Sequence, residues 1–220
     1  MKIIGHRGGQ SDPAKQNTLD SIAQAIKHKI EAVEIDVRVS RDMIPVLNHD
    51  NYVTVGDRTL LVRTATLSEL KAFKHDLTTL TEVLKTAHNK VKLLIEIKPV
   101  EPIEPIIGVI KLALNGGFDT KNITICSFDF HILSQVKRTL PEVRIAVSEQ
   151  WSGVRAGHRA RRLNTKHLIM NQRWLWVGYV RPLANRGYDI TAFTVNDPKR
   201  AERLARMGVG SIVTDYPSKF

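Results

Sequence analysis

Short apolar runs rich in Val, Ile and Leu alternate along this chain with stretches in which apolar residues recur every three or four positions. The runs are four to seven residues long, which is the usual length of buried strands. We predict strands at residues 2–5, 32–37, 44–48, 92–98, 122–128, 143–148, 167–170, 189–195 and 211–215. Most of these nine candidate strands are separated by enough residues to form a helix.

The intervening stretches show the spacing of amphipathic helices. Apolar side chains repeat at such intervals at Leu19, Ile22, Ala23 and Ile26, and again at Leu80, Val83, Leu84 and Ala87. Residues that favour helix N-caps precede three of the stretches, namely Thr18, Thr79 and Asp197. Pro198 then occupies a first helical position, where proline is favoured. Strands that alternate with helices predict a parallel sheet.

One connection is too short to hold a helix. Only six residues separate Val37 from Ile44, whereas a crossover between parallel strands needs about a dozen. The run at 44–48 is therefore predicted to fold back on 32–37 as an antiparallel hairpin. Eight strand–helix units remain, which predicts an α/β fold. We expect a (β/α)8 TIM barrel with a β-hairpin excursion after the second strand, formed by residues 1–220 as a single domain.

Composition adds charge to this picture. The chain is 42% hydrophobic and 25% charged, with a net charge of +11 and a pI near 9.9. The positive charge favours anionic ligands, such as phosphates, nucleic acid or an acidic membrane surface. The one cysteine, Cys126, lies in the apolar run "NITICSF" and is predicted to be a buried, inert thiol in a reducing compartment. No signal-peptide pattern and no apolar stretch of membrane-spanning length occurs, so we expect a cytoplasmic protein.

Charged residues gather where the predicted strands end. In "EIDVRVSRDMIPVLNHD", Glu34 and Asp36 are two residues apart, so both side chains project from one face of a strand, about 6.6 Å apart. Other polar residues follow neighbouring strands, and the hairpin returns one of them to the same end: His6, Arg7, His49, Glu96 and Lys98. In a parallel barrel the carboxyl ends of the strands form the mouth where chemistry takes place.

Three carboxylates that converge at this mouth would repel one another unless a cation held them. Oxygen ligands without cysteine favour Mg²⁺ or Ca²⁺ over zinc. Glu34, Asp36 and Glu96 are therefore candidate ligands of a divalent cation. The competing interpretation is a structural ion-pair network, in which Arg7 and Lys98 neutralise the acids and close the end of the barrel.

In their order along the chain, the motifs resemble those of the glycerophosphodiester phosphodiesterases, whose barrel is similar to that of phosphatidylinositol phospholipase C. They are "HRG", "NT", "EIDVRVSRD…PVLNHD", "TLTEVL", "IEIKP", "CSFD", "FTVND" and "VTDYP". The resemblance spans nearly the whole chain. It implies that Glu34, Asp36 and Glu96 bind a divalent ion. It further implies that His6 and His49 act as acid and base, and that the remaining pair, Arg7 and Lys98, holds phosphate.

The implied reaction is metal-dependent hydrolysis of a glycerophosphodiester to glycerol 3-phosphate and an alcohol. Either water or a hydroxyl next to the ester can be the nucleophile, and either histidine can be the base. Three positions depart from the family pattern. Gln16 stands in place of a glutamate, Met43 in place of a glycine, and Phe193 in place of a tryptophan. The loss of a negative charge at Gln16 affects the expected metal affinity.

Three alternatives stay open at this point. The substrate could be a lysophospholipid, cleaved by a lysophospholipase D-type reaction, with residues 151–176 making transient contact with a membrane surface. That segment mixes arginines with three tryptophans, and its competing interpretation is a solvated basic helix with tryptophans in the core. The Gln16 change also allows a weakened or non-catalytic phosphate-binding relative. A nucleic-acid-binding module is disfavoured, because no recognition motif for nucleic acid accompanies the positive charge.

Overall fold

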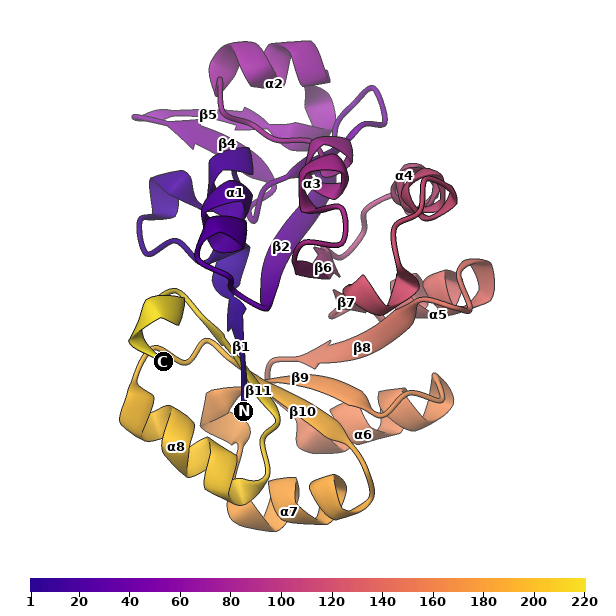
Figure 1. Ribbon diagram of the computed structural model, residues 1–220. Coiled ribbons are helices and arrows are strands. Elements are labelled where there is room, and N and C mark those ends of the chain that lie inside the picture. Colours follow the sequence, from indigo (N-terminus) through magenta and orange to yellow (C-terminus); the bar gives the residue numbers. More distant parts are fainter.

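The computed structural model describes residues 1–220, which form a closed barrel of eight parallel strands (Figure 1). The strands are, in their order around the barrel, β1 (Lys2–Gly5), β2 (Ala32–Val39), β6 (Lys92–Ile97), β7 (Ile123–Ser127), β8 (Arg144–Glu149), β9 (His167–Asn171), β10 (Asp189–Phe193) and β11 (Ser211–Thr214). Strand β1 closes the ring, because Ile4 lies opposite Ala32 of β2 and opposite Val213 of β11. The predicted TIM barrel is confirmed.

Helices surround the barrel in the gaps between strands. They are α1 (Leu19–Lys27), α3 (Leu80–Ala87), α4 (Glu104–Asn115), α5 (Phe130–Thr139), α6 (Gly153–Arg162), α7 (Val177–Asn185) and α8 (Pro198–Met207). The side chains of Thr18, Thr79 and Asp197 accept hydrogen bonds from the first turns of their helices, as predicted for N-caps. Even the longest helix, α4, has only 12 residues, and none of the helices could cross a lipid bilayer.

The hairpin excursion is confirmed as well. Strand β3 (Pro45–Leu47) runs antiparallel to β2 outside the ring, with Leu47 opposite Val37. The chain then forms three elements that the apolar pattern did not predict, β4 (Tyr52–Val55), β5 (Arg58–Leu61) and α2 (Leu67–Phe73). Strands β4 and β5 were missed because they are short and mostly exposed, and α2 has only seven residues, of which Leu70 alone is buried. Beneath them lies a separate small core, made of Val46, Val53, Val62, Ala65, Leu70 and Leu77.

The main core lies between the barrel and its helices, where 43 buried residues form one apolar cluster. Inside the barrel a second, smaller cluster is made of Ile4, Leu94, Cys126, Ala146, Ile169 and Val213. Burial raises the pKa of the Cys126 thiol well above its usual value, and the prediction of a buried thiol is confirmed. Above this apolar plug the inward-facing positions become charged.

One interpretation of residues 151–176 is correct for the helix and wrong for the tryptophans, because α6 is a basic helix with Arg155, Arg161 and Arg162 exposed. The three tryptophans of the chain, which that interpretation places in the core, are exposed instead, Trp151 by 64%, Trp174 by 48% and Trp176 by 63%. The reason is topological. Each of them lies in a connection that follows β8 or β9 rather than on a helix face that packs against the barrel.

Candidate active site

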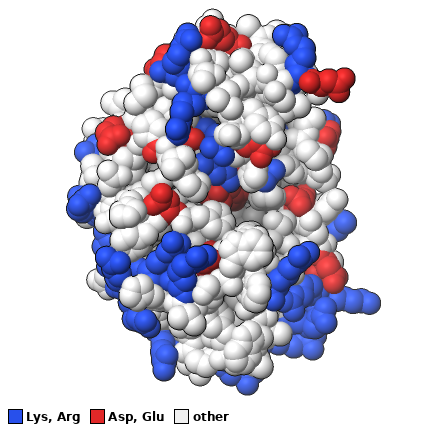
Figure 2. All heavy atoms as spheres, turned by 180° about the vertical axis from the view of Figure 1, so that it is seen from behind, with Lys and Arg blue, Asp and Glu red and all other residues white.

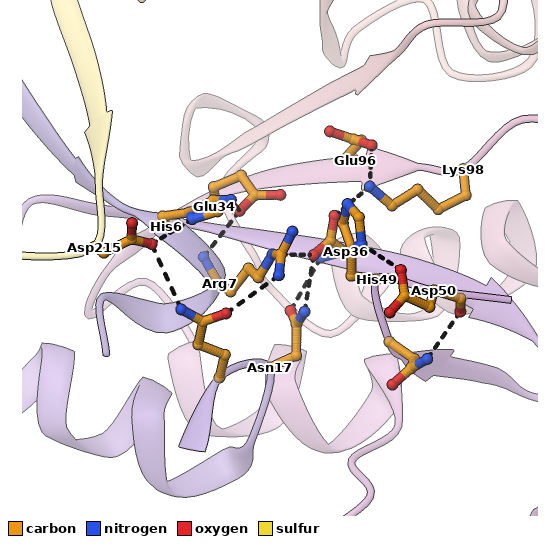
Figure 3. Close-up of polar contacts among 12 residues, drawn as sticks. His6, Arg7, Asn17, Glu34, Asp36, His49, Asp50, Glu96, Lys98 and Asp215 are labelled. Atoms are coloured by element: carbon orange, nitrogen blue, oxygen red, sulfur yellow. Dashed lines mark hydrogen bonds and ion pairs between the residues drawn. The ribbon is translucent and has the colours of Figure 1, made fainter. Parts of the chain in front are cut away.

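The three acidic residues meet at the mouth of the barrel. Strands β2 and β6 are adjacent and in register, so that Asp36 lies directly opposite Glu96 and Glu34 lies two residues earlier on the same face. One carboxylate oxygen from each of the three side chains lies within 4.8 Å of the others (Figure 3). All three side chains are buried or nearly so. Residues remote in sequence thus form one compact anionic cluster.

Lys98 lies against this cluster. Its Nζ is 2.5 Å from Oδ1 of Asp36 and also donates a hydrogen bond to Glu96. Burial alone would lower the pKa of Lys98, but Asp36 and Glu96 raise it above its usual value. Burial alone would likewise raise the pKa of Asp36, but Lys98 and Arg7 lower it to about 2. At neutral pH this lysine and this aspartate are therefore both charged.

Arg7 extends the network from the turn after β1. Its Nε forms an ion pair with Oδ2 of Asp36 at 3.1 Å, and its backbone N–H donates to Oε2 of Glu34 at 2.9 Å. The turn depends on Gly8, which has a φ of 93°. A Cβ at Gly8 would come within 2.1 Å of the hydroxyl oxygen of Ser21 in α1. The glycine of "HRG" therefore lets helix α1 approach and fixes Arg7 above the acids.

His6 is oriented by an acid from the opposite end of the chain. Its Nδ1 lies 2.6 Å from Oδ1 of Asp215, the residue after β11. Burial opposes ionisation of Asp215, but hydrogen bonds from His6 and Asn196 hold the pKa of its carboxyl below the usual value. The other ring nitrogen, Nε2, lies 4.0 Å from Oε2 of Glu34. His6 thus directs one nitrogen toward the acidic cluster and keeps the other on a carboxylate.

His49 reaches the same mouth through the hairpin. The neighbouring Asn48 donates its backbone N–H to the carbonyl of Asp36 at 3.1 Å, which ties this loop to β2. Nδ1 of His49 lies 2.9 Å from Asp50. Partial burial and the positive charge of Lys98 lower the pKa of His49, so its imidazole is neutral at pH 7. Figure 3 shows His49 beside Asp36 and His6 beside Glu34.

Sequence reasoning assigned no role to two residues that hold the site together. Asn17 forms a reciprocal pair with Asp36, because its side-chain N–H donates to Oδ2 at 2.8 Å and its side-chain oxygen accepts from the backbone N–H at 3.1 Å. Asp215 holds His6. Both belong to motifs that were visible in the sequence, "NT" and "VTDYP". A polar residue directly after a barrel strand was the signal for Asp215, since every such residue reaches the mouth.

The residues at the mouth fit a divalent cation. Oε1 of Glu34 is buried and has no hydrogen-bond partner. Burial and the charges of Asp36 and Glu96 raise the pKa of Glu34 well above its usual value. Three carboxylates face only two permanent cations, Arg7 and Lys98, so the cluster has one excess negative charge. A divalent ion would satisfy the free oxygen, and the resulting excess positive charge would match a phosphodiester monoanion.

A family model places the chain among known proteins. The model of the glycerophosphoryl diester phosphodiesterase family matches residues 6–219. The chain belongs to this family. This match confirms the resemblance of the motifs over nearly the whole chain. The buried acids and the two histidines beside them lie at the carboxyl ends of the strands, where parallel barrels have their active sites.

Individual relatives agree with this assignment. A Bacillus subtilis protein, YhdW, named as a glycerophosphodiester phosphodiesterase, is 34% identical over 99% of this chain and 95% of its own length. A glycerophosphodiester phosphodiesterase from Caldanaerobacter subterraneus is 28% identical over 98% and 94%. A solved phosphodiesterase from Oleispira antarctica, in complex with the product sn-glycerol-3-phosphate, superposes with a TM-score of 0.87 at 28% identity, over 100% of this chain and 94% of that one.

The structure also shows how the unusual Gln16 is accommodated. Its side-chain oxygen accepts a hydrogen bond from Arg7 at 3.2 Å, as a carboxylate oxygen could. Its side-chain nitrogen donates to the carbonyl of Gln10 at 2.9 Å and lies 3.5 Å from Oδ1 of Asp215. A glutamate could not donate to either oxygen. The amide therefore keeps Arg7 in place while it links that arginine to the residue that orients His6.

Proposed function

We propose that this protein hydrolyses glycerophosphodiesters to glycerol 3-phosphate and an alcohol, with a divalent cation bound by Glu34, Asp36 and Glu96. The observation that carries the proposal is the unpartnered, buried oxygen of Glu34 within a three-carboxylate cluster. Family membership supports the reaction type. The all-oxygen ligand set supports Mg²⁺ or Ca²⁺ as the ion.

The two histidines divide the proton transfers. His49 is neutral at pH 7 because its pKa is lowered, so it suits the role of general base and takes the proton of the attacking hydroxyl. That oxygen forms a bond to phosphorus while the bond from phosphorus to the departing alkoxide breaks. His6 gives its Nε2 proton to the alkoxide, and the carboxylate of Asp215, in contact with Nδ1, holds the ring in place for this transfer. The nucleophile is water or the glycerol hydroxyl next to the ester. Attack by that hydroxyl first gives a cyclic phosphate, and a second attack, by water, then breaks one ring P–O bond to give glycerol 3-phosphate.

The charged groups at the mouth hold the phosphate. Arg7 presents a planar guanidinium above Asp36, which suits two phosphoryl oxygens, and Lys98 adds a point charge beside it. When bound, the cation polarises the phosphoryl oxygens and neutralises charge that develops in the transition state. The surrounding acids of the cluster are buried, so these charges act on the phosphate with little screening by water.

Glycerophosphocholine is the substrate for the first test. Glycerol 3-phosphate and choline should be released in equal amounts, whereas cleavage of the other ester bond would give glycerol and phosphocholine. His6→Ala and His49→Ala should each lose about 10²–10⁴-fold in turnover. His158→Ala is the matched control, because His158 is an exposed histidine on α6. Turnover by both active-site variants at the wild-type rate would refute the proposal.

A lysophospholipid is the second candidate substrate, and one observation favours it. Three exposed tryptophans follow strands whose ends form the mouth, and tryptophan is enriched where proteins meet a lipid interface. Release of choline from lysophosphatidylcholine, compared with its release from glycerophosphocholine at equal enzyme concentration, separates the two substrates.

A further inference from the structure

An exposed apolar surface lies on one side of the barrel mouth. We name it the tryptophan collar and define it by Trp151, Val154, Trp174, Trp176 and Val177, which are 45–84% exposed. These residues lie in the connection after β8, in the connection after β9 and in the first turns of α6 and α7. Because helices in a parallel barrel begin at the end where the strands finish, the collar shares the face that holds the acidic cluster.

The collar is held in place by contacts beneath it. The hydroxyl of Tyr179, in the first turn of α7, donates to the carbonyl of Gly153 at the start of α6. The two helix starts lie so close that a Cβ on Gly153 would come within 2.5 Å of the Tyr179 ring. The ring of Trp176 covers Gly178 at a distance that leaves no room for a Cβ either. Leu175 is buried between the two exposed tryptophans that flank it. The collar is therefore a preformed surface.

The part of the chain that carries the collar is strongly positive. The last 70 residues contain 13 Lys and Arg but only 4 Asp and Glu, and so carry +9 of the net charge of +11. Figure 2 views the molecule from behind, where Lys and Arg gather in the lower half on both sides of an uncharged area. Arg173 and Lys199 are exposed near the starts of α7 and α8. Glu149, the buried acid that ends β8, forms an ion pair with Arg155.

Helix starts add to this positive field. Helices α1, α2, α3 and α4 each have an acidic residue in the first turn, whereas α6, α7 and α8 have none. The unpaired N–H groups of a helix start carry partial positive charge. Acidic residues offset this charge in the first set, and the N-cap Asp197 offsets it in α8, but no acidic residue does so at the starts of α6 and α7. The side of the mouth that carries the collar therefore combines exposed tryptophans, cationic side chains and the uncompensated starts of α6 and α7.

We propose that the tryptophan collar docks this protein on the surface of an anionic phospholipid bilayer, with the barrel mouth facing the lipid. Indole rings favour the headgroup region of a bilayer, where their apolar area leaves water while the N–H stays hydrated. Exposed Lys and Arg are attracted to anionic headgroups and add to the binding. A nucleic acid would also attract the charge, but it gives no reason for exposed valines such as Val154 beside the tryptophans.

Tryptophan fluorescence reports on the collar alone, because all three tryptophans of the chain belong to it. We expect the emission to shift to the blue when vesicles of phosphatidylcholine mixed with phosphatidylglycerol are added, and the protein to sediment with them. Vesicles of phosphatidylcholine alone should bind more weakly. Added NaCl should weaken binding to the mixed vesicles, because salt screens the cationic side chains. No blue shift and no sedimentation with the mixed vesicles would overturn the proposal.

Variants with matched controls locate the surface. Replacing all three tryptophans by serine should weaken sedimentation with the mixed vesicles at least tenfold, and Arg173→Glu should weaken it about tenfold. Leu112→Ser and Arg161→Glu are the controls, because both residues are exposed near the ends of their helices, away from the mouth. Circular dichroism checks that each variant folds. Equal loss in the controls, or dimerisation through the collar seen by gel filtration, would contradict docking on lipid.

The docking surface is separate from the catalytic residues. His6→Ala should therefore bind the mixed vesicles as the wild type does, even though it is expected to lose turnover. The triple tryptophan variant should retain turnover of soluble glycerophosphocholine within about twofold. Loss of vesicle binding in His6→Ala would contradict a separate docking surface, while failure of the proposed phosphodiesterase activity would leave the result with vesicles unchanged.

Discussion

The two sides of the barrel mouth differ in what their strand ends carry. On one side, β1, β2, β6 and the loop after β3 supply the three acids, both cations of the cluster and both imidazoles. On the other side, β8 and β9 lead into exposed tryptophans and a surplus of arginine. The candidate active site and the exposed apolar surface therefore lie in separate sets of connections. Both lie above the same apolar cluster inside the barrel, to which strands from both sides contribute.

The two sides also differ in whether their charged side chains are buried in ion pairs or exposed to solvent. In the acidic cluster, Lys98 and Arg7 are paired with buried carboxylates, and each charge has a defined partner. Around the collar, Arg173 and Lys199 are exposed to solvent, where salt screens their charge more strongly than that of a buried group. A buried charge should thus be sensitive to substitution, and an exposed one should be sensitive to ionic strength.

The largest predicted effect comes from comparing the turnover of two variants, one with a substitution on each side of the mouth. His6→Ala should reduce turnover of glycerophosphocholine by about 10²–10⁴-fold, because proton transfer to the leaving group is lost. Trp151→Ser should change it by less than about twofold, because Trp151 is an exposed side chain after β8 and belongs to neither the acidic cluster nor its flanking histidines. Steady-state kinetics of both variants with this soluble substrate measures the contrast. Similar losses in the two variants would mean that the sides are not independent.

An effect of similar size in free energy is expected on stability. Lys98→Met should lower the free energy of unfolding by about 3–5 kcal/mol, because it leaves Glu96 as a nearly buried carboxylate without its ion-pair partner and Asp36 with Arg7 alone. Lys199→Met is the control, because that lysine is exposed on α8. Urea unfolding measures both. A stability change for Lys98→Met no larger than the control would show that the buried ion pairs are not coupled to folding.

The raised pKa of Glu34 should be visible in the pH dependence of stability. Its pKa is raised in the folded protein, so the folded state binds a proton more readily than the unfolded chain, whose glutamates titrate near about 4.3. Metal-free protein should therefore gain stability as the pH falls from neutral toward about 5, and Glu34→Gln should lack this part of the gain. Mg²⁺ should raise the melting temperature of the wild type at neutral pH by a few degrees. Identical pH profiles for the two proteins would contradict the raised pKa.

The smallest predicted effect concerns Gln16. Gln16→Glu places a fourth carboxylate beside Arg7, so divalent cations should bind a few-fold more tightly, by about 1 kcal/mol in this partly exposed position. The same change removes the N–H that donates to Gln10, so turnover should not rise in proportion. Calorimetric titration with Mg²⁺ measures the affinity, and Gln150→Glu, which lies on the other side of the mouth, is the control. Weaker cation binding by Gln16→Glu would contradict the charge count at the site.

The fold was predictable because its buried strands are continuous apolar runs, and all nine predicted strands match the structure with small shifts at their ends. The short connection at Val37–Ile44 also predicted the hairpin, which is present. The β4–β5 hairpin was not predictable in this way, since its strands are mostly exposed and are held by a small local core. The spacing of apolar residues reflects which side chains are buried. A strand with few buried side chains therefore shows no clear apolar pattern in the sequence.

The candidate site was predictable in its charged members because charge is rare in a buried strand, so Glu34 and Asp36 were conspicuous among valine and isoleucine. Asn17 and Asp215 were not, because asparagine and aspartate are ordinary in loops and only the closed barrel shows that these two touch Asp36 and His6. The exposure of Trp151 was also beyond the sequence, since a tryptophan in an irregular segment gives no indication of which way it faces.

The most direct test of the central claim is the release of glycerol 3-phosphate from glycerophosphocholine by the purified protein, before and after treatment with a chelator. We predict that release falls to the background rate when divalent ions are removed and returns when Mg²⁺ or Ca²⁺ is restored, and that Glu34→Gln fails to recover. Release that continues unchanged in the chelated protein would contradict a catalytic cation held by Glu34, Asp36 and Glu96.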